Sequence, residues 1–319
     1  MTGAKVNRMS GAGRRCMSKF AVVLFAAALI FATAAEGAFF DTAGKSARPM
    51  GMGEVFLAAA GDASSYWYNP AGLAKFDKKQ AGLSYGLPVA AISDLSISQL
   101  NVAVPLGTNK GLGLGVSYGG IDVANDMVIS GGYGWALSER LAIGGNVKLM
   151  RWSVEGQNDP YTDKKDSNLS KMTFSLDLSA SCGLGELFGL GNFTAGVFVK
   201  DAIKPNIAEN GNEGGKLPID TRVGLLMQKG DLAVEGDVGF VDGNTVCRVG
   251  GESGITGSSL KLRGGVIYGS DFKEDTEKLD INVGLGYRFG TLVFDYAYNY
   301  PFEIKQTSGK HFISFGVSF

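Results

Sequence analysis

Residues 79–319 alternate between apolar and polar side chains along most of their length, and this period of two constrains the fold more than any other feature. In 279–289, for example, the apolar side chains share one face, and the polar and glycine residues share the other. Such alternation predicts β-strands with one apolar face. Fourteen segments of this kind can be counted, at 79–86, 96–105, 110–118, 126–137, 139–153, 168–181, 192–200, 220–229, 231–240, 244–252, 259–269, 279–289, 291–299 and 310–319. An even number of strands, most of them near ~10 residues long, predicts an all-β antiparallel transmembrane β-barrel over 79–319.

The same alternation would also fit a soluble β-sandwich, in which the apolar faces point inward. The two ends of the chain favour the barrel. At the start, five basic residues precede an uninterrupted apolar run, 20–32, and small residues follow it. This order predicts a signal peptide over 1–38, cleaved near Ala34 or Gly37, with either Met1 or Met17 as its first residue. A single membrane anchor is the alternative, but the run is shorter than the ~20 residues that span a bilayer.

At the other end, Phe315, Val317 and Phe319 continue the alternation up to the last residue. A terminal phenylalanine in this periodic setting resembles the C-terminal signal that the outer-membrane barrel assembly machinery reads. We therefore expect a protein of the bacterial outer membrane, delivered through its signal peptide. Its apolar strand face would contact outer-membrane lipid, and its polar face would line the lumen.

Between these parts, residues 39–78 do not alternate. The stretch 46–76 is apolar and rich in glycine and alanine, and it contains three aromatic residues in a row, Tyr66, Trp67 and Tyr68, followed by 69–72. Proline after asparagine suits the first position of a short helix, here at Pro70. An apolar segment without strand periodicity needs an enclosure, so we expect 39–78 to form a plug, or hatch, inside the barrel.

Three runs in this segment carry a family resemblance: Ala47-Arg48-Pro49-Met50-Gly51-Met52-Gly53, Gly61-Asp62-Ala63-Ser64-Ser65 and Tyr68-Asn69-Pro70-Ala71-Gly72-Leu73-Ala74. They resemble the N-terminal signature of the FadL-like outer-membrane transport superfamily, and within it the PorV/PorQ-type branch. The resemblance covers about thirty residues. It implies a fourteen-stranded barrel whose N-terminal segment forms a hatch in the lumen, and it does not specify what passes through.

The residues expected to face inward in the strands over 110–153 have small side chains or none, beginning with Gly111, Gly113 and Gly115. Glycine within a strand commonly marks the close approach of another backbone. We interpret these glycines as the wall beside the hatch, because they occupy alternate positions and therefore face the same side of the sheet. The alternative is that they only permit twist and curvature.

The later strands carry ten charged residues with inward parity, five acidic and five basic: Asp177, Arg222, Glu235, Asp237, Arg248, Lys261, Arg263, Asp280, Arg288 and Asp295. An ion-selective filter more often shows rings of one sign. Balanced signs predict cross-strand ion pairs that close the lumen. A path for a polar substrate is the alternative.

Composition excludes other classes of function. The net charge is −1, so the chain has no basic footprint for nucleic acid. With one histidine and three cysteines, no pattern has the spacing of metal ligands, and we expect no metal, no cofactor and no enzymatic activity.

Two hypotheses of function remain. In the first, the barrel passively transports small hydrophobic, fatty-acid-like solutes. The solute would contact Phe56, Tyr66, Trp67 and Tyr68, and would leave when the hatch residues Asn69, Pro70, Ala71 and Gly72 shift. In the second, which the PorV-type resemblance implies, the barrel is the outer-membrane partner of a protein secretion or surface-attachment system. Long loops such as 201–219 would then bind a secreted protein.

Overall fold

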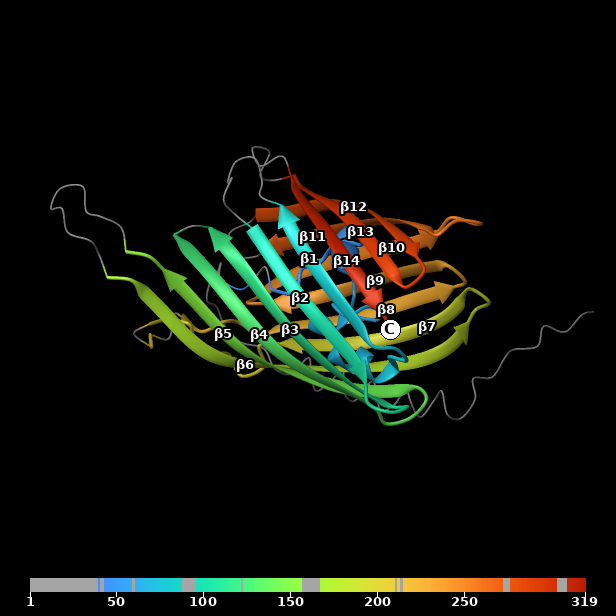
Figure 1. The fold of residues 1–319 in the computed structure, drawn as a ribbon, viewed down its shortest axis with the longest axis horizontal. Coiled ribbons are helices and arrows are strands. Elements are labelled where there is room, and N and C mark those ends of the chain that lie inside the picture. The colour runs from blue at the N-terminus through green and yellow to red at the C-terminus, as the bar shows by residue number, and fades with distance from the viewer. Residues whose placement is uncertain are drawn as a thin grey trace, which may run out of the picture.

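The computed structural model describes residues 40, 43–58, 61–87, 96–121, 123–156, 167–209, 211–212, 215–271, 276–302 and 309–319. The predicted signal peptide, 1–38, lies outside the described residues. The strands form one closed antiparallel barrel of fourteen strands, in which each strand pairs with its neighbours in sequence and β1 pairs with β14 (Figure 1). The predicted fold class is therefore confirmed.

The strand bounds agree closely with the predicted segments. The strands are β1 (Gln80–Leu87), β2 (Ser96–Pro105), β3 (Lys110–Ile121), β4 (Ala124–Ala136), β5 (Leu141–Val154), β6 (Leu169–Leu187), β7 (Gly191–Lys200), β8 (Asp220–Lys229), β9 (Leu232–Val241), β10 (Asn244–Gly254), β11 (Leu260–Asp271), β12 (Thr276–Phe289), β13 (Leu292–Pro301) and β14 (Lys310–Ser318). The prediction was wrong at the end of β6, which we expected at residue 181. A register shift between Gly183 and Gly185 lets β6 continue along β7 after the alternation is lost.

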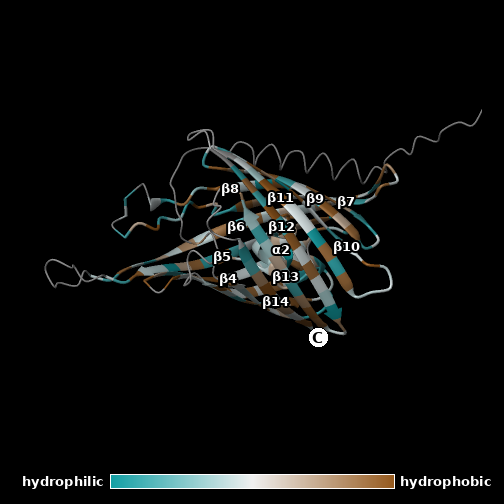
Figure 2. Ribbon diagram, turned by 90° about the horizontal axis from the view of Figure 1, so that it is seen from above, coloured by the Kyte–Doolittle hydropathy of each residue, from teal (hydrophilic) through white to brown (hydrophobic). Residues whose placement is uncertain are grey.

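The barrel closes where its first strand, β1, pairs with its last strand, β14, with Leu83 opposite Phe315 and Gln80 opposite Ser318. Because every strand edge is paired, the barrel has no open sheet edge. Figure 2 shows apolar and polar residues alternating along the strands. The apolar set points outward, as the exposed fractions of Phe174 (62%) and Phe289 (72%) illustrate. This is the arrangement of a barrel in lipid, and the opposite of a sandwich.

The two ends of the barrel differ. Odd strands run toward the end at which β7 is joined to β8 by the long connection 201–219, and we call this the loop end. Even strands run toward the turn end, where short turns such as 230–231 and 290–291 join the strands. Both ends of the barrel sequence, Gln80 and Phe319, also lie at the turn end.

The lumen is filled by the N-terminal segment, which we call the plug (described residues 43–58 and 61–76). It contains one short α-helix, α2 (Ala47–Gly51), and two 3-10 helices, η1 (Ser65–Trp67) and η2 (Pro70–Lys75). As predicted, Pro70 begins its helix. Helix α2 packs against β11–β14, whereas η2 packs against β2–β6. No helix among the described residues is long and apolar enough to span a membrane.

Candidate functional site

The plug approaches the barrel wall closely at the small inward residues of β3–β5. A Cβ atom added at Gly113 would lie 3.0 Å from the ring of Tyr66, and one added at Gly134 would lie 2.6 Å from the carbonyl oxygen of Pro70. At Gly111 and Gly115 it would overlap Leu73 and the Tyr66 hydroxyl respectively. These positions therefore need glycine because the plug occupies the space of a side chain.

Polar contacts fix the same face of the plug. The Trp67 indole nitrogen donates to Asn101 Oδ1 at 2.6 Å, and the Asn146 amide donates to the carbonyl oxygen of Tyr66 at 2.9 Å. The backbone N–H of Ala71, in η2, donates to the Ser179 hydroxyl at 2.8 Å. Because all these groups are buried, each bond is made out of reach of bulk water, and losing one of them is unfavourable.

A continuous hydrophobic cluster runs through this side of the lumen, and we call it the apolar column. Its buried members are Phe40, Ala63, Tyr66, Trp67, Leu73, Phe76, Ala103, Val128, Met150, Trp152 and Leu217, and Ala43, Tyr68, Val154 and Ile207 pack against them. At the loop end, Trp152 donates its indole hydrogen to the carbonyl oxygen of Ile207 at 2.7 Å, beneath the connection 201–219. At the turn end the column finishes with Phe76, beside η2.

The aromatic residues that the sequence singled out do not form one site. Tyr66 and Trp67 belong to the apolar column, and Tyr68 borders it. Phe56 lies in a second cluster, with Met52, Val55, Ala58, Leu226 and Ala233. Tyr68 connects the two, since its ring meets that of Phe56 edge to face at 5.9 Å between centroids. Asn69, before η2, donates its side-chain amide to the carbonyl oxygen of Leu57.

The opposite side of the lumen is charged. Arg263 pairs with Asp295 at 2.7 Å and with Glu252 at 3.1 Å, and Arg248 pairs with Asp237 at 3.1 Å. These residues lie on different strands, so the predicted cross-strand ion pairs are present. These ion pairs lie on the β9–β13 side of the lumen, which we call the charged side, whereas the strand residues of the apolar column lie on β2, β4 and β5.

Arg48, on α2, joins the plug to the charged side. Its guanidinium donates to both carboxylate oxygens of Glu252, at 3.2 Å from Nε and 2.8 Å from Nη2, and it pairs with Asp62 at 3.0 Å. Sequence reasoning missed this contact. Glu252 shares the inward parity of Arg248 and could have been found from it, but nothing in the plug sequence marks Arg48 as its partner.

A second pair lies within the plug, between Lys45 and Glu54 at 3.0 Å. Burial alone would raise the pKa of Glu54, but the positive charges of Lys45, Arg248 and Arg222 outweigh burial and hold that pKa far below its ordinary value. Glu54 is therefore a carboxylate at neutral pH.

A buried charge cluster anchors the connection after β7. Lys148 Nζ lies 2.7 Å from carboxylate oxygens of both Asp177 and Asp201, and Ser175 donates its hydroxyl to Asp201. Asp201 adopts a positive φ of 55°, and its backbone N–H donates to Asp177. Residues 142 and 144 were expected to face the lumen, and Lys148 lies on the same face of the strand, so its inward position could have been predicted. Its two carboxylate partners could not, because only the fold brings them together.

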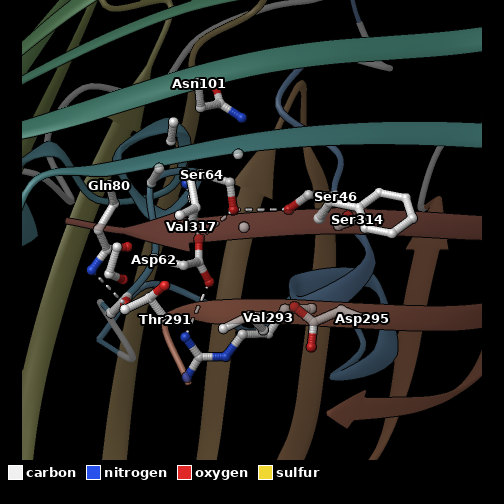
Figure 3. Close-up of a pocket in the computed structure, with 18 of the residues that line it drawn as sticks. Ser46, Asp62, Ser64, Gln80, Asn101, Thr291, Val293, Asp295, Ser314 and Val317 are labelled. Carbon is white, nitrogen blue, oxygen red and sulfur yellow. Dashed lines mark hydrogen bonds and ion pairs between the residues drawn. The ribbon is translucent and has the colours of Figure 1, made fainter. Parts of the chain in front are cut away.

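Cavities adjoin the plug at both ends of the barrel. A cavity of about 410 Å³ at the loop end is lined by charged residues that include Lys45, Glu54 and Arg248, together with Tyr68. At the turn end, a cavity of about 380 Å³ lies between the plug and β1, β13 and β14 (Figure 3). A smaller one of about 230 Å³ includes Glu252 and Phe76, and Arg48 lines both turn-end cavities.

Within the described part of the chain, no group of three or more His, Cys, Asp or Glu side chains could hold a metal ion. The lone histidine, His311, lies among aromatic rings of β13, with Nδ1 2.7 Å from the Tyr296 hydroxyl. The geometry provides a plugged lumen with an apolar column beside β2, β4 and β5 and ion pairs among β9–β13.

No protein-family model matches the sequence, and a search of curated proteins found no match. Solved structures do resemble the fold. CymD, described as a monoaromatic hydrocarbon channel, aligns with a TM-score of 0.68 at 15% identity, over 88% of this chain and 99% of that one. The Ralstonia pickettii toluene transporter TbuX has a TM-score of 0.62 at 13% identity, over 88% and 100%. A FadL homologue of Pseudomonas aeruginosa has a TM-score of 0.60 at 13% identity, over 86% and 98%. The chain therefore shares the fold of FadL-type outer-membrane channels.

Proposed function

We propose that the protein is a passive channel of the bacterial outer membrane for small hydrophobic solutes, with the plug as its gate. The observation that carries the proposal is the apolar column, which extends from the loop end to the turn end along one side of the plug. The likeness to hydrocarbon and toluene channels supports the same class of solute. The loop end would face outside the cell, as the long loops of bacterial barrels do.

In this proposal, a solute enters beside Trp152 and Leu217 and moves along Tyr66 and Trp67 toward Phe76. The side chains of the column are packed against one another, so a solute passes only when some of them move. Residues 69–72 include the first half of η2, which lies against β3–β5. A shift of this segment would open the column, and its release would close it again.

The test compares two buried methionines of different clusters, Met150 on the barrel strand β5 and Met52 in the plug. Met150→Gln places an amide in the apolar column with little change in volume, while Met52→Gln does the same in the second cluster, beside Phe56. We expect Met150→Gln to reduce uptake of toluene or a medium-chain fatty acid by vesicles, because an unpaired amide in an apolar path is unfavourable. Met52→Gln should leave uptake near the wild-type rate.

Equal loss in both variants, with folded barrels shown by their heat-modifiable gel mobility, would argue against a path along the column. The PorV-type alternative predicts another outcome. If wild-type vesicles take up no hydrophobic solute, and the protein extracted gently from its own membrane carries a stoichiometric protein companion in native mass spectrometry, the transport proposal fails.

A further inference from the structure

Two polar cavities approach each other across the thin part of the plug. Lys45 lines the loop-end cavity, and the next residue, Ser46, lines the 380 Å³ turn-end cavity. Consecutive residues of the plug therefore line different cavities, so the plug segment that begins at Lys45 lies between the two spaces. On the barrel wall, Arg248 faces the loop-end cavity and Glu252 faces a turn-end cavity. Four residues of strand correspond to ~13 Å.

The barrier between these cavities is α2 and the turn that follows it. Small wall residues surround it: the Cα of Gly51 would lie 3.0 Å from a Cβ added at Gly284, and a Cβ added at Gly51 would lie 3.5 Å from that of Ala297. Gly250 lies between Arg248 and Glu252, and a Cβ atom added there would overlap the carbonyl oxygen of Met52. The barrier is therefore one short helix packed against small residues of β10–β13 and against the larger side chains of Ile97 and Phe312.

Arg48 is the only charged residue of α2, whose other residues are alanine, proline, methionine and glycine. Its bidentate pair with Glu252 is the kind of charge-assisted hydrogen bonding that contributes most. Glu252 also accepts from Lys261 at 3.0 Å and from Arg263 at 3.1 Å. Losing Arg48 would leave the wall carboxylate paired, while α2 would keep its apolar packing and the Ala47 N–H bond to Ser314.

The lining of this side suits water and ions. Figure 3 shows Ser46, Ser64 and Asp62 directed into the turn-end cavity, where the Ser46 hydroxyl donates to that of Ser64 at 2.9 Å. Ser314 and Asp295 come from the barrel wall. Charges of both signs line both cavities, so neither sign of ion is repelled throughout.

We propose that the charged side of the lumen is a second, closed passage, for water and small inorganic ions, and that the Arg48–Glu252 pair keeps it closed. The loop-end cavity of this passage shares Tyr68 and Leu217 with the apolar column, but beyond that cavity the passage follows α2, and its opening moves α2 rather than η2. It is therefore an activity separate from hydrophobic uptake, and it stands or falls independently of the proposed function.

The experiment measures conductance in planar bilayers with potassium chloride as the only salt. Arg48→Gln removes the charge and the bidentate pair. We expect it to increase the time spent conducting about tenfold or more over wild type, which corresponds to about 1.4 kcal/mol. Arg288→Gln is the matched control, because Arg288 lines the same turn-end cavity from the wall, and it should stay as closed as wild type.

A disulfide then tests whether α2 is the moving part. Replacing Gly51 and Ala297 by cysteine would place two Cβ atoms about 3.5 Å apart, which is within the range of a disulfide. In an Arg48→Gln background with Cys247→Ser, the oxidised protein should be closed and the reduced protein should conduct. The proposal is overturned if folded Arg48→Gln is no more conductive than wild type. It is equally overturned if the oxidised and reduced proteins conduct alike.

Discussion

Replacing Gly134 by alanine should loosen the plug, whereas the same change at Gly131 should not. Both glycines lie on β4, three residues apart, and they face opposite sides of the barrel wall. The new Cβ at Gly134 would lie 2.6 Å from the Pro70 carbonyl oxygen, short by about 0.8 Å of the 3.4 Å at which ordinary contact begins. The new Cβ at Gly131 would meet Leu114 at 3.7 Å, an ordinary contact.

The magnitude follows from two opposing effects. Overpacking of a close contact costs ~1–3 kcal/mol. Replacing a strand glycine by alanine contributes roughly 0.5–1 kcal/mol of stability, and this gain applies to both variants. It therefore cancels when the two are compared, and Gly134→Ala should be less stable than Gly131→Ala by ~1–3 kcal/mol.

The assay is reversible unfolding by urea in lipid vesicles, followed by tryptophan fluorescence. A chain lacking 46–76 supplies the decisive comparison, because it no longer contains the Pro70 carbonyl. In that chain the difference between the two variants should vanish. The reasoning would be refuted if the variants were equally stable in the complete protein, or if their difference persisted without the plug.

Three further predictions concern the polar contacts of the plug and lumen. Lowering the pH from neutrality should weaken plug attachment once it falls below about 4.5, the ordinary pKa of Glu54. A carboxyl whose pKa is depressed by folding stabilises the folded state above its unfolded pKa, and this stabilisation is lost as the pH falls toward its folded pKa. Glu54→Gln should flatten this acid dependence in the urea assay, and an unchanged slope would contradict it. Lys148→Met should destabilise the barrel by ~3–5 kcal/mol, because two buried carboxylates lose their cation; the urea midpoint measures this, and Lys148→Met/Asp201→Asn should recover part of it. Trp67→Phe should cost ~1–3 kcal/mol by leaving Asn101 without its indole donor, while Trp135→Phe, on the outward face, should cost little.

The barrel could be predicted from the sequence because its signal is local. A strand with one face against lipid and one against the lumen alternates residue by residue, whatever its neighbours are. The β2 and β8 segments were predicted to the residue for this reason. The end of β6 could not be, since the bulge at Gly183 and Gly185 breaks the alternation but not the pairing.

The candidate site was only partly predictable. Alternation placed Gly111 and Gly113 on the lumen face of one strand and ten charged residues on the lumen faces of later strands. Composition marked 46–76 as a segment that needs an enclosure. Which atoms meet across the lumen was not encoded locally. The contact between Arg48 and Glu252 joins residues 204 positions apart.

The sequence by itself therefore determined the number, order and facing of the strands, because a strand's periodicity records only which environment each face meets. The tertiary structure alone decided that the apolar column and the ion pairs of β9–β13 lie on different sides of the lumen, and that Phe56 and Trp67 belong to different clusters. It also placed the short helix α2 between two polar cavities. These features depend on how a non-periodic segment packs inside a closed barrel, and such packing is set by the shape of the whole lumen.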